Sequence, residues 1–225
     1  MNIIKANSLT KFERVSLVLV YVFLLSNAYL LKDSPIALIS AICGITYTFF
    51  AGKGYPFCYL FGITGSAFYC FLSLKSALWG NLLLYAGYYL PMQVLGFFQW
   101  NKNLKQGVKE IVKTKLVLKE QILLCIISLM LSIAFILVLY LMNDKSPIID
   151  GITTVFSVAG MYLTVKRCIE QWFVWMIVNG LSLFMWLKIA LNGENVYSTV
   201  VMWFVYFILA IYFYFIWKKE LKNSN

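Results

Sequence analysis

Histidine is absent from the 225-residue sequence, and charged residues make up only 12% of it. Without histidine there is no imidazole to serve as a metal ligand or as a general base. The cysteines stand singly, with no CxxC spacing, and are interpreted as buried structural thiols: Cys43, Cys58, Cys70, Cys125 and Cys168. We therefore predict no catalytic residues, no metal site and no cofactor, and we do not expect an enzyme.

The low charge content also argues against a water-soluble domain, which would cover its surface with charged side chains. Hydrophobic residues make up 62% of the chain and gather in long runs. About 20 apolar residues in a helix cross the ~30 Å hydrocarbon core of a bilayer. Such runs predict an all-α transmembrane protein, with spans at residues 13–31, 35–51, 56–74, 77–99, 117–142, 147–165, 171–191 and 196–217. Whether the first run spans the membrane stays open, because charged residues crowd its start.

The net charge of +10 could indicate a nucleic-acid partner, but the basic residues are placed as membrane topology requires. With both termini inside, most of the 19 basic residues fall in cytoplasmic segments. The exceptions, on the outer side, are Lys32, Lys75, Lys145 and Lys188. This bias follows the positive-inside rule. It predicts a multi-pass membrane protein with a cytoplasmic C-terminus and no nucleic-acid partner.

Two stretches of the sequence begin and end with similar short motifs. Ser34-Pro35 opens one apolar run and Ser146-Pro147 opens another, and the two stretches end in Trp100-Asn101-Lys102 and Trp217-Lys218-Lys219. Three-span units therefore recur, and the single span between them restores the orientation of the chain. Two parallel repeats related by an axis along the membrane normal are the result.

This pattern predicts four segments along the chain. They are an N-terminal segment with the candidate first span (1–33), a first three-helix repeat (34–103), a basic loop with a linker helix (104–145), and a second three-helix repeat with a basic C-terminus (146–225). Transporters built from such repeats place their substrate between the halves near the middle of the membrane.

The seventh predicted span carries Trp172, Trp175 and Asn179 at a spacing of i, i+3, i+7, which places them on one helix face. An asparagine in hydrocarbon must be paired, either with another helix or with a ligand. An interhelical hydrogen bond with tryptophan packing would explain these residues as well. Tryptophan in the middle of a span favours a ligand site, because membrane tryptophans prefer the interfaces.

The fourth predicted span has a counterpart to this face. Tyr89 and Gln93 are one turn apart, Trp100 ends the span, and Pro91 removes a backbone hydrogen bond between them. Two buried carboxamides, Gln93 and Asn179, would suit the polar edges of a flat small molecule whose ring lies against aromatic faces. No acidic or basic residue lies in the central part of any predicted span, which favours facilitated diffusion over proton coupling.

At these residues the sequence resembles the PnuC family of bacterial vitamin transporters. The resemblance rests on FGITGSAFY (61–69), YYLPMQVLGFFQW (88–100) and QWFVWMIVNG (171–180). It implies a SWEET-like fold of two parallel three-helix bundles (3+1+3) plus an extra N-terminal helix, in the bacterial inner membrane and often as a homotrimer. It assigns Trp172, Trp175, Asn179 and Gln93 to the vitamin site, with Trp100 as a less firmly assigned member.

The resemblance also implies the reaction. The main members of the family carry nicotinamide riboside by facilitated diffusion, and a cytoplasmic kinase traps the product. The cationic pyridinium of that vitamin suits an indole face without any buried carboxylate. Thiamine is also an aromatic cation, so a thiamine carrier of the same fold stays an alternative, as does another B-vitamin such as riboflavin. A membrane scaffold without transport is the alternative from a different class.

Overall fold

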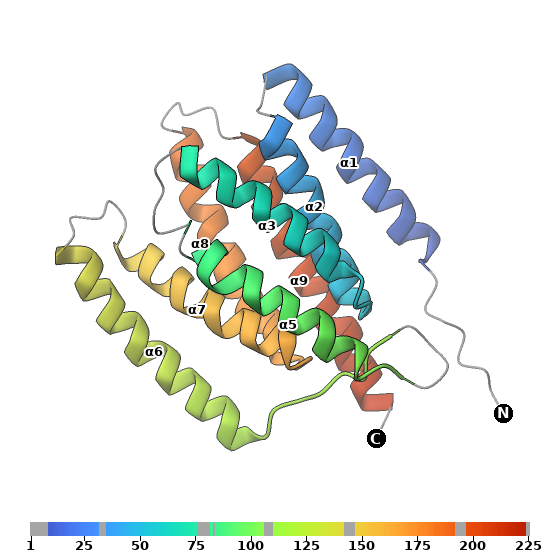
Figure 1. Cartoon of the computed structure of the whole chain (residues 1–225), viewed down its shortest axis with the longest axis vertical. Coiled ribbons are helices and arrows are strands. Elements are labelled where there is room, and N and C mark those ends of the chain that lie inside the picture. Colours follow the sequence, from blue (N-terminus) through green and yellow to red (C-terminus); the bar gives the residue numbers. More distant parts are fainter. Residues whose placement is uncertain are drawn as a thin grey trace. The chain divides into compact units, whose positions relative to one another are not determined.

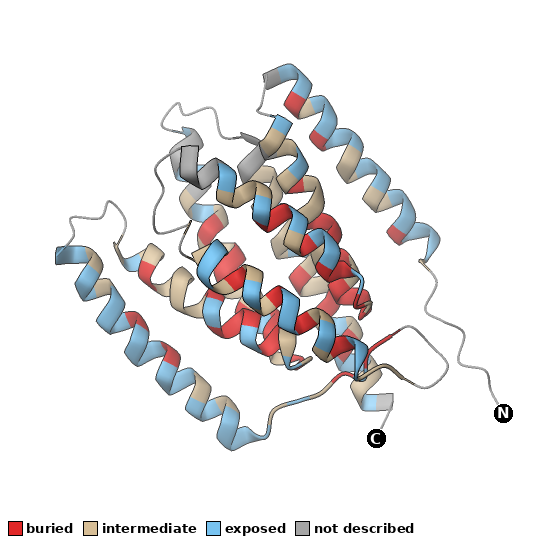
Figure 2. Ribbon diagram, in the orientation of Figure 1, coloured by how far each residue is buried: buried red, intermediate tan, exposed pale blue. Residues whose placement is uncertain are grey.

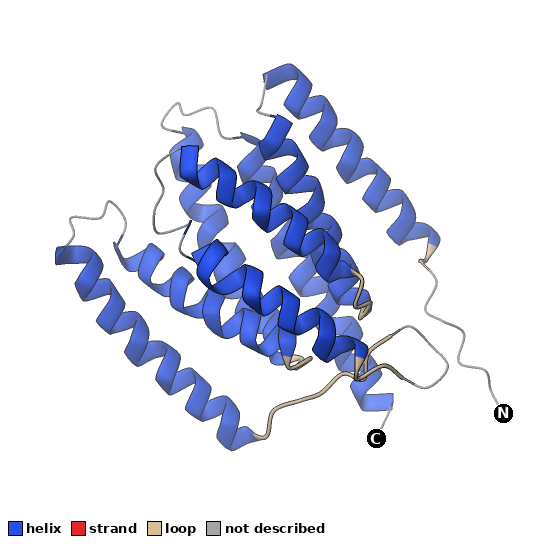
Figure 3. Ribbon diagram, in the orientation of Figure 1, coloured by secondary structure: helices blue, strands red, loops and turns tan. Residues whose placement is uncertain are grey.

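The computed structural model describes residues 9–31, 35–75, 82, 84–105, 110–141, 147–191 and 197–223. Within these ranges the regular structure is entirely helical and no strand forms (Figure 3), which confirms the all-α prediction. The helices are α1 (Lys11–Leu31), α2 (Pro35–Lys53), α3 (Cys58–Lys75), the π-helical turn η1 (Tyr85–Tyr89), α5 (Leu90–Asn101), α6 (Leu118–Leu141), α7 (Pro147–Val165), α8 (Glu170–Leu191) and α9 (Tyr197–Asn223) (Figure 1).

Four of the described helices contain segments long and apolar enough to cross a bilayer: Lys11–Leu30, Leu118–Leu141, Pro147–Val165 and Val200–Lys222. Leu38–Lys53 and Cys58–Phe71 are shorter apolar segments. The helix bounds agree with the predicted runs to within a few residues, except that the start of the predicted span 77–99 lies largely outside the described residues. That all eight runs cross the membrane stays a prediction.

The chain divides into two compact units, Met1–Val112 and Lys113–Asn225, and we describe each by itself. In the first unit α3 packs against α2, η1 and α5, while α1 contacts α2. Two polar links join α1 to α2. Lys53 Nζ lies 3.0 Å from Glu13 Oε1, with both side chains buried, and Tyr21 OH lies 2.7 Å from Thr46 Oγ1. Of the charges that begin the first apolar run, Glu13 therefore belongs to a buried ion pair, while Lys11 and Arg14 are exposed.

A capping box begins α1. The Thr10 N–H donates to Glu13 Oε2 at 2.7 Å, and the Glu13 N–H donates to Thr10 Oγ1 at 3.1 Å. These bonds satisfy donors that the first turn of a helix leaves without intrahelical partners. Glu13 therefore both caps α1 and pairs with Lys53.

A π-helical turn lies where the sequence places Pro91. The Leu90 N–H donates to Tyr85 O, five residues back, and α5 follows with Pro91 in its first turn. Proline is tolerated in the first turn of a helix because the N–H that it lacks would have no intrahelical acceptor there. The wider turn encloses Tyr89, which is 9% exposed.

In the second unit α7 packs against α6 and α8, and α8 packs against α9. Figure 2 shows α6 exposed along most of its length. Its buried residues are Ser128 and Ser132, and Gly151 of α7 lies directly against Ile136. Small residues at this contact let the two helices approach closely.

The same turn ends α2 and α7. After α2, the Gly54 N–H donates to Ala51 O and the Tyr55 N–H to Phe50 O. After α7, the Arg167 N–H donates to Thr164 O and the Cys168 N–H to Leu163 O. The residue in the left-handed conformation is Gly54 (φ 78°) in one turn and Arg167 (φ 64°) in the other. Both are Schellman-type ends, and they set a register of 113 residues between the units.

This register continues into the next helices. The Tyr59 N–H donates to Pro56 O, and the Trp172 N–H donates to Ile169 O, 113 residues on in each case. Such a correspondence is what a duplicated three-helix unit would produce. The SWEET-like 3+1+3 arrangement itself stays a prediction.

Candidate functional site

In the second unit, Trp172 lies in an aromatic cluster formed by α8 and α9. Its ring centroid is 5.5 Å from that of Phe213 and 5.6 Å from that of Trp217, which it meets edge-to-face. Trp172 is 2% exposed, and its indole N–H has no acceptor among the described residues. A buried indole N–H normally finds a partner, so this donor can serve a ligand.

Trp175, one turn further along α8, is held by α7. Its indole N–H donates to Thr164 Oγ1 at 3.1 Å, and the Thr164 hydroxyl donates to Gly160 O at 2.8 Å. A Cβ at Gly160 would lie 3.0 Å from Cε2 of the indole, so the ring rests on the backbone of α7. The orientation of this half-buried indole is therefore set by a glycine and a hydroxyl.

Asn179 follows one turn later on the same face. It is 4% exposed, and Ser182 beyond it is also 4% exposed. The structure therefore brings Trp172, Trp175 and Asn179 together on one side of α8, as their spacing predicts. Carboxamide and hydroxyl groups buried in an apolar helix point inward, because hydrocarbon cannot satisfy them.

In the first unit, Gln93 lies between α5 and α3. Gln93 Nε2 donates to Ser66 Oγ at 3.0 Å, and both side chains are 5% exposed. Gln93 Oε1 receives no hydrogen bond within the described residues. A Cβ at Gly62 would lie 3.2 Å from Gln93 Cδ, so the carboxamide rests directly on α3.

Tyr89 and Trp100 lie on either side of Gln93 along the chain. Tyr89 meets the ring of Tyr85 edge-to-face at 4.8 Å, and Tyr85 lies 4.3 Å from Tyr69 of α3. Trp100 is fully buried and meets Tyr59 edge-to-face at 5.1 Å. Trp100 is therefore a packing partner of Tyr59, whereas Tyr89 belongs to a tyrosine cluster one turn from Gln93.

The two aromatic contacts at the helix ends correspond. Tyr59 with Trp100 repeats Trp172 with Trp217, at interplanar angles of 84° and 81°. The 113-residue register pairs Tyr59 with Trp172 and Ser66 with Asn179, while Trp100 and Trp217 are 117 residues apart. The second offset pairs Gln93 with Ala210. Each unit thus carries one carboxamide at this level, but on a different helix.

The loop after α7 holds polar contacts outside the spans. Burial raises the pKa of the Cys168 thiol, against the smaller opposite effect of a hydrogen bond from Thr114 Oγ1 at 3.5 Å. The thiol is therefore protonated at neutral pH, as a structural cysteine should be. Cys58 is buried and Cys43 and Cys70 are partly buried, but Cys125 is exposed on α6, so the expectation of a buried thiol is wrong there, because most of the surface of α6 is exposed.

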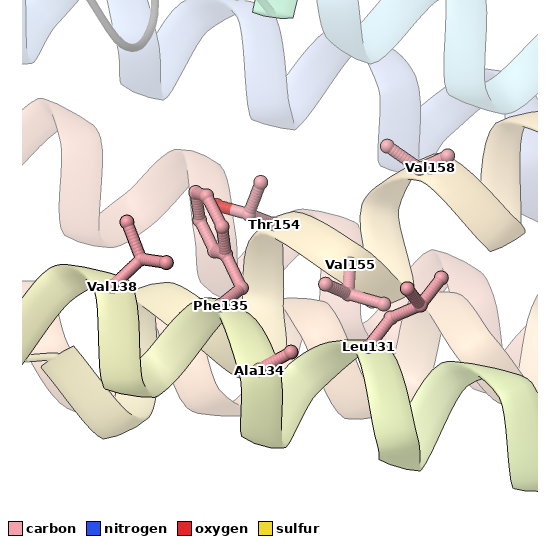
Figure 4. Close-up of a pocket in the computed structure, with 7 residues that line it drawn as sticks. All are labelled: Leu131, Ala134, Phe135, Val138, Thr154, Val155 and Val158. Carbon is pink, nitrogen blue, oxygen red and sulfur yellow. The ribbon is translucent and has the colours of Figure 1, made fainter.

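A groove between α6 and α7 has a volume of about 320 Å³ (Figure 4). Its lining residues are Leu131, Ala134, Phe135, Val138, Thr154, Val155 and Val158. The hydroxyl of Thr154 is the only polar side-chain group among them, so a polar ligand would leave its own polar groups unpaired there. The groove contains none of the predicted site residues.

A family model described as nicotinamide mononucleotide transporter matches residues 34–219. The chain belongs to this family. It is 30% identical over 198 residues to the "Nicotinamide riboside transporter PnuC" of Neisseria mucosa, covering 86% of this chain and 75% of that protein. The protein of the same name from Haemophilus influenzae is 30% identical over 197 residues, with 86% and 83% covered.

Family membership identifies the chain as a multi-pass membrane transporter and not an enzyme. The fold agrees with a solved structure titled "Crystal structure of the Vitamin B3 transporter PnuC", with a TM-score of 0.84 and 28% sequence identity. The match covers 96% of this chain and 94% of that one. The resemblance to the PnuC family is thereby confirmed.

Sequence reasoning missed the residues that hold the predicted ones in place. Ser66 and Gly62 support Gln93, while Thr164 and Gly160 support Trp175. In both cases a glycine and a hydroxyl residue are four positions apart on one helix. That small-residue spacing, common at close helix contacts in membranes, was the available signal.

Proposed function

We propose that this transporter carries nicotinamide riboside into the cytoplasm by facilitated diffusion. The observation that carries the proposal is the face of α8, where the indoles of Trp172 and Trp175 and the carboxamide of Asn179 lie within two turns. In a family whose relatives bear the name nicotinamide riboside transporter, this face supplies what an aromatic cation with hydroxyl groups requires.

Each proposed residue has a physical role in this reading. A desolvated pyridinium over an indole gains about 2 kcal/mol, so no buried carboxylate is needed to bind the charge. Trp175 suits this role because Thr164 fixes its ring. The carboxamides of Asn179 and Gln93 would bind the hydroxyl and amide groups of the substrate, and Tyr89 and Trp100 complete the proposed set.

The positions of the charged residues in the helices favour uniport over proton coupling. In the described helices the Asp, Glu, Lys and Arg residues lie within the first or last two turns, as with Asp150 of α7 and Lys188 of α8. No proton relay through the middle of these helices is available. Net uptake would then require a cytoplasmic kinase that traps the product by phosphorylation.

The setting of this transport is proposed with it. The charge bias supports a cytoplasmic C-terminus, and the family resemblance supports the bacterial inner membrane. The three-helix repeats 34–103 and 146–225 would form the transport core, joined by 104–145 and preceded by 1–33. A homotrimer is the assembly that the family resemblance implies.

Binding by the purified protein tests the substrate. Titration calorimetry should show saturable binding of nicotinamide riboside that is lost in Trp175→Ala and Asn179→Ala while thermal unfolding stays near that of the wild type. Ser132→Ala on α6 is the matched control for loss of a buried polar group. Tight binding of thiamine with none of nicotinamide riboside would identify the thiamine carrier instead. Binding of neither vitamin would favour the scaffold.

Transport in vesicles tests the mechanism. Radiolabelled nicotinamide riboside should equilibrate across the membrane at the same rate with and without an imposed proton gradient. Accumulation that follows the gradient would refute uniport. Including the kinase and ATP inside the vesicles should convert equilibration into accumulation.

A further inference from the structure

The carboxamide of Gln171, in the first turn of α8, has a fixed orientation. Its Nε2 donates to the backbone carbonyl of Cys168 at 3.0 Å. A backbone carbonyl can only accept a hydrogen bond, so the amide nitrogen must face it. The amide oxygen, Oε1, therefore faces the other way.

This oxygen is a buried acceptor. Gln171 is 1% exposed, and Oε1 receives no hydrogen bond within the described residues. A buried acceptor without a donor costs free energy, and most such groups in proteins have a partner. The arrangement therefore favours a ligand that brings an N–H or O–H donor to Oε1.

The first unit shows that the turn before α8 does not need a carboxamide. By the 113-residue register, Gln171 corresponds to Cys58. The Cys58 N–H donates to Tyr55 O at 3.0 Å, just as the Gln171 N–H donates to Cys168 O at 3.2 Å. The same backbone turn thus forms with a thiol in place of the amide. Folding of the turn gives no reason to bury an unsatisfied oxygen at Gln171.

Gln171 extends the face of α8 that carries the candidate site. Gln171, Trp175 and Asn179 are spaced i, i+4, i+8, so they follow one another at intervals of about 6 Å along the helix. The neighbouring Trp172 is also buried, and its indole N–H has no acceptor within the described part of the chain. The face therefore has a carboxamide on either side of an indole, and its N-terminal end offers both an acceptor and a donor.

From these observations we propose that Gln171 is a further substrate-binding residue, whose Oε1 accepts a hydrogen bond from the carboxamide NH₂ of the substrate. The inference rests on the proposed function and adds an orientation to it. Nicotinamide riboside is a ring with a carboxamide on one side and a ribose on the other. A primary carboxamide carries both complements of the N-terminal end of α8, an N–H for Gln171 and a carbonyl oxygen for the Trp172 N–H. The ribose then lies toward Asn179.

Binding of two ligands to the purified protein tests the contact. In 3-acetylpyridine riboside a methyl group replaces the NH₂, while the ring, its charge and the carbonyl oxygen are kept. The wild type should bind this compound about tenfold more weakly than nicotinamide riboside, the size of one net hydrogen bond. Gln171→Met should weaken the binding of nicotinamide riboside about tenfold, but that of the acetyl compound by less than about twofold, because the bond is already missing there.

Two further variants separate this contact from a structural role. Gln121 also donates through Nε2 to a backbone carbonyl, Leu116 O at 3.0 Å, so Gln121→Met is the matched control and should leave both affinities unchanged. Gln171→Cys introduces the residue that the first unit has at this position, and it should bind both ligands as Gln171→Met does. Thermal unfolding of each variant shows whether the fold is kept.

Each outcome supports or refutes a separate statement. Wild-type protein that binds no nicotinamide riboside refutes the proposed function itself, whatever Gln171 does. Wild-type protein that binds both ligands equally well refutes the carboxamide contact without any variant. Equal weakening of both ligands in Gln171→Met means that the glutamine supports the fold or holds a water, and it also refutes the contact. If the loss instead disappears with a 2′-, 3′- or 5′-deoxy riboside, Gln171 binds the ribose and the proposed orientation is wrong.

Discussion

The two units share the same helix-end turns and aromatic contacts, but they differ in the side chains at the middle of their helices. Both have the same hydrogen-bonded turn after their first core helix and the same edge-to-face aromatic pair, Tyr59 with Trp100 and Trp172 with Trp217. Where the second unit has Thr164 and Trp175, the first has Ala51 and Gly62 by the 113-residue register. One unit thus presents an oriented indole and the other an oriented carboxamide.

The comparison teaches how a duplicated frame can serve an asymmetric ligand. Backbone turns and buried aromatic contacts are needed for each unit to fold, so they recur. The polar side chains at mid-helix are not needed for folding, since a buried polar group costs free energy until it is paired. They can therefore differ between the units, as the roles proposed for Trp175 and Gln93 would require. Four predictions break or sharpen this comparison.

The largest effect is expected at the buried ion pairs. Glu13 and Lys53 of the first unit are 2% and 3% exposed, whereas in the second unit Lys113 is 3% and its partner Glu220 is 26% exposed. Glu13→Ala should lower the free energy of unfolding by about 3–5 kcal/mol, because it leaves a buried ammonium. Glu220→Ala also leaves a buried ammonium, but it should cost less, about 1–3 kcal/mol, because Lys113 keeps its contact with the ring of Trp217.

Denaturant unfolding of the purified variants measures both ion-pair costs. The double variant Glu13→Leu/Lys53→Met should recover most of the stability, because it removes both charges together. Equal losses in Glu13→Ala and Glu220→Ala would show that burial does not distinguish the two pairs.

The next effect concerns the aromatic pairs. A Cβ at Gly96 would collide with the ring of Tyr59, whereas the matching position of the second unit, at the 117-residue offset, is Phe213, whose ring lies 5.5 Å from that of Trp172. Gly96→Ala should therefore destabilise the protein by about 1–3 kcal/mol through overpacking. Gly87→Ala is the control, since no atom lies within 4 Å of its Cβ position. If thermal unfolding moves equally in both variants, close packing at Tyr59 is not the cause.

A smaller effect is expected at the indole. Thr164→Val removes the acceptor for Trp175 Nε1–H and should weaken nicotinamide riboside binding by about 5- to 10-fold, the equivalent of about 1–1.4 kcal/mol. Thr164→Ser should restore it, because a hydroxyl returns at the same place. Calorimetric titration reads the affinity, and tryptophan fluorescence reports the indole. Wild-type affinity in Thr164→Val would mean that the threonine does not fix the orientation of the Trp175 indole.

The smallest effect concerns the two turns. Arg167 adopts the left-handed conformation that Gly54 adopts in the first unit, and a residue with a Cβ pays about 1 kcal/mol for it. Arg167→Gly should therefore be about 1 kcal/mol more stable than Arg167→Ala, since both variants lose the same side-chain contacts. Thermal unfolding of the pair measures the difference. Equal stabilities would show that the turn after α7 carries no backbone cost.

Much of the fold could be predicted because helices that span a membrane have a clear signal in the sequence. Hydrocarbon requires each span to satisfy its own backbone, so length and apolarity locate the helices to within a few residues. Pro35 and Pro147 begin α2 and α7 as expected. The π-helical turn at Tyr85–Tyr89 was not predicted, because the shift from i→i−4 to i→i−5 bonding has no simple sequence signal.

The candidate site divides in the same way. Helical spacing was enough to place Trp172, Trp175 and Asn179 on one face, since they lie within two turns of a single helix. Spacing could not find Ser66 or Thr164, because each acts on a residue of another helix. Trp100 was a less firmly assigned site residue on the family resemblance; it packs against Tyr59, and its place in the ligand site stays a prediction.

By itself the sequence determined that this chain is an all-α membrane protein of the PnuC family, with aromatic and carboxamide residues grouped along its spans. These properties depend on local periodicity and on the exclusion of charge from hydrocarbon, and both are readable along one helix. The tertiary structure alone decided which end of Gln93 is occupied and what holds Trp175. Those choices depend on contacts of a few ångströms between helices that are far apart in the sequence, where a missing Cβ or a single hydroxyl sets the outcome.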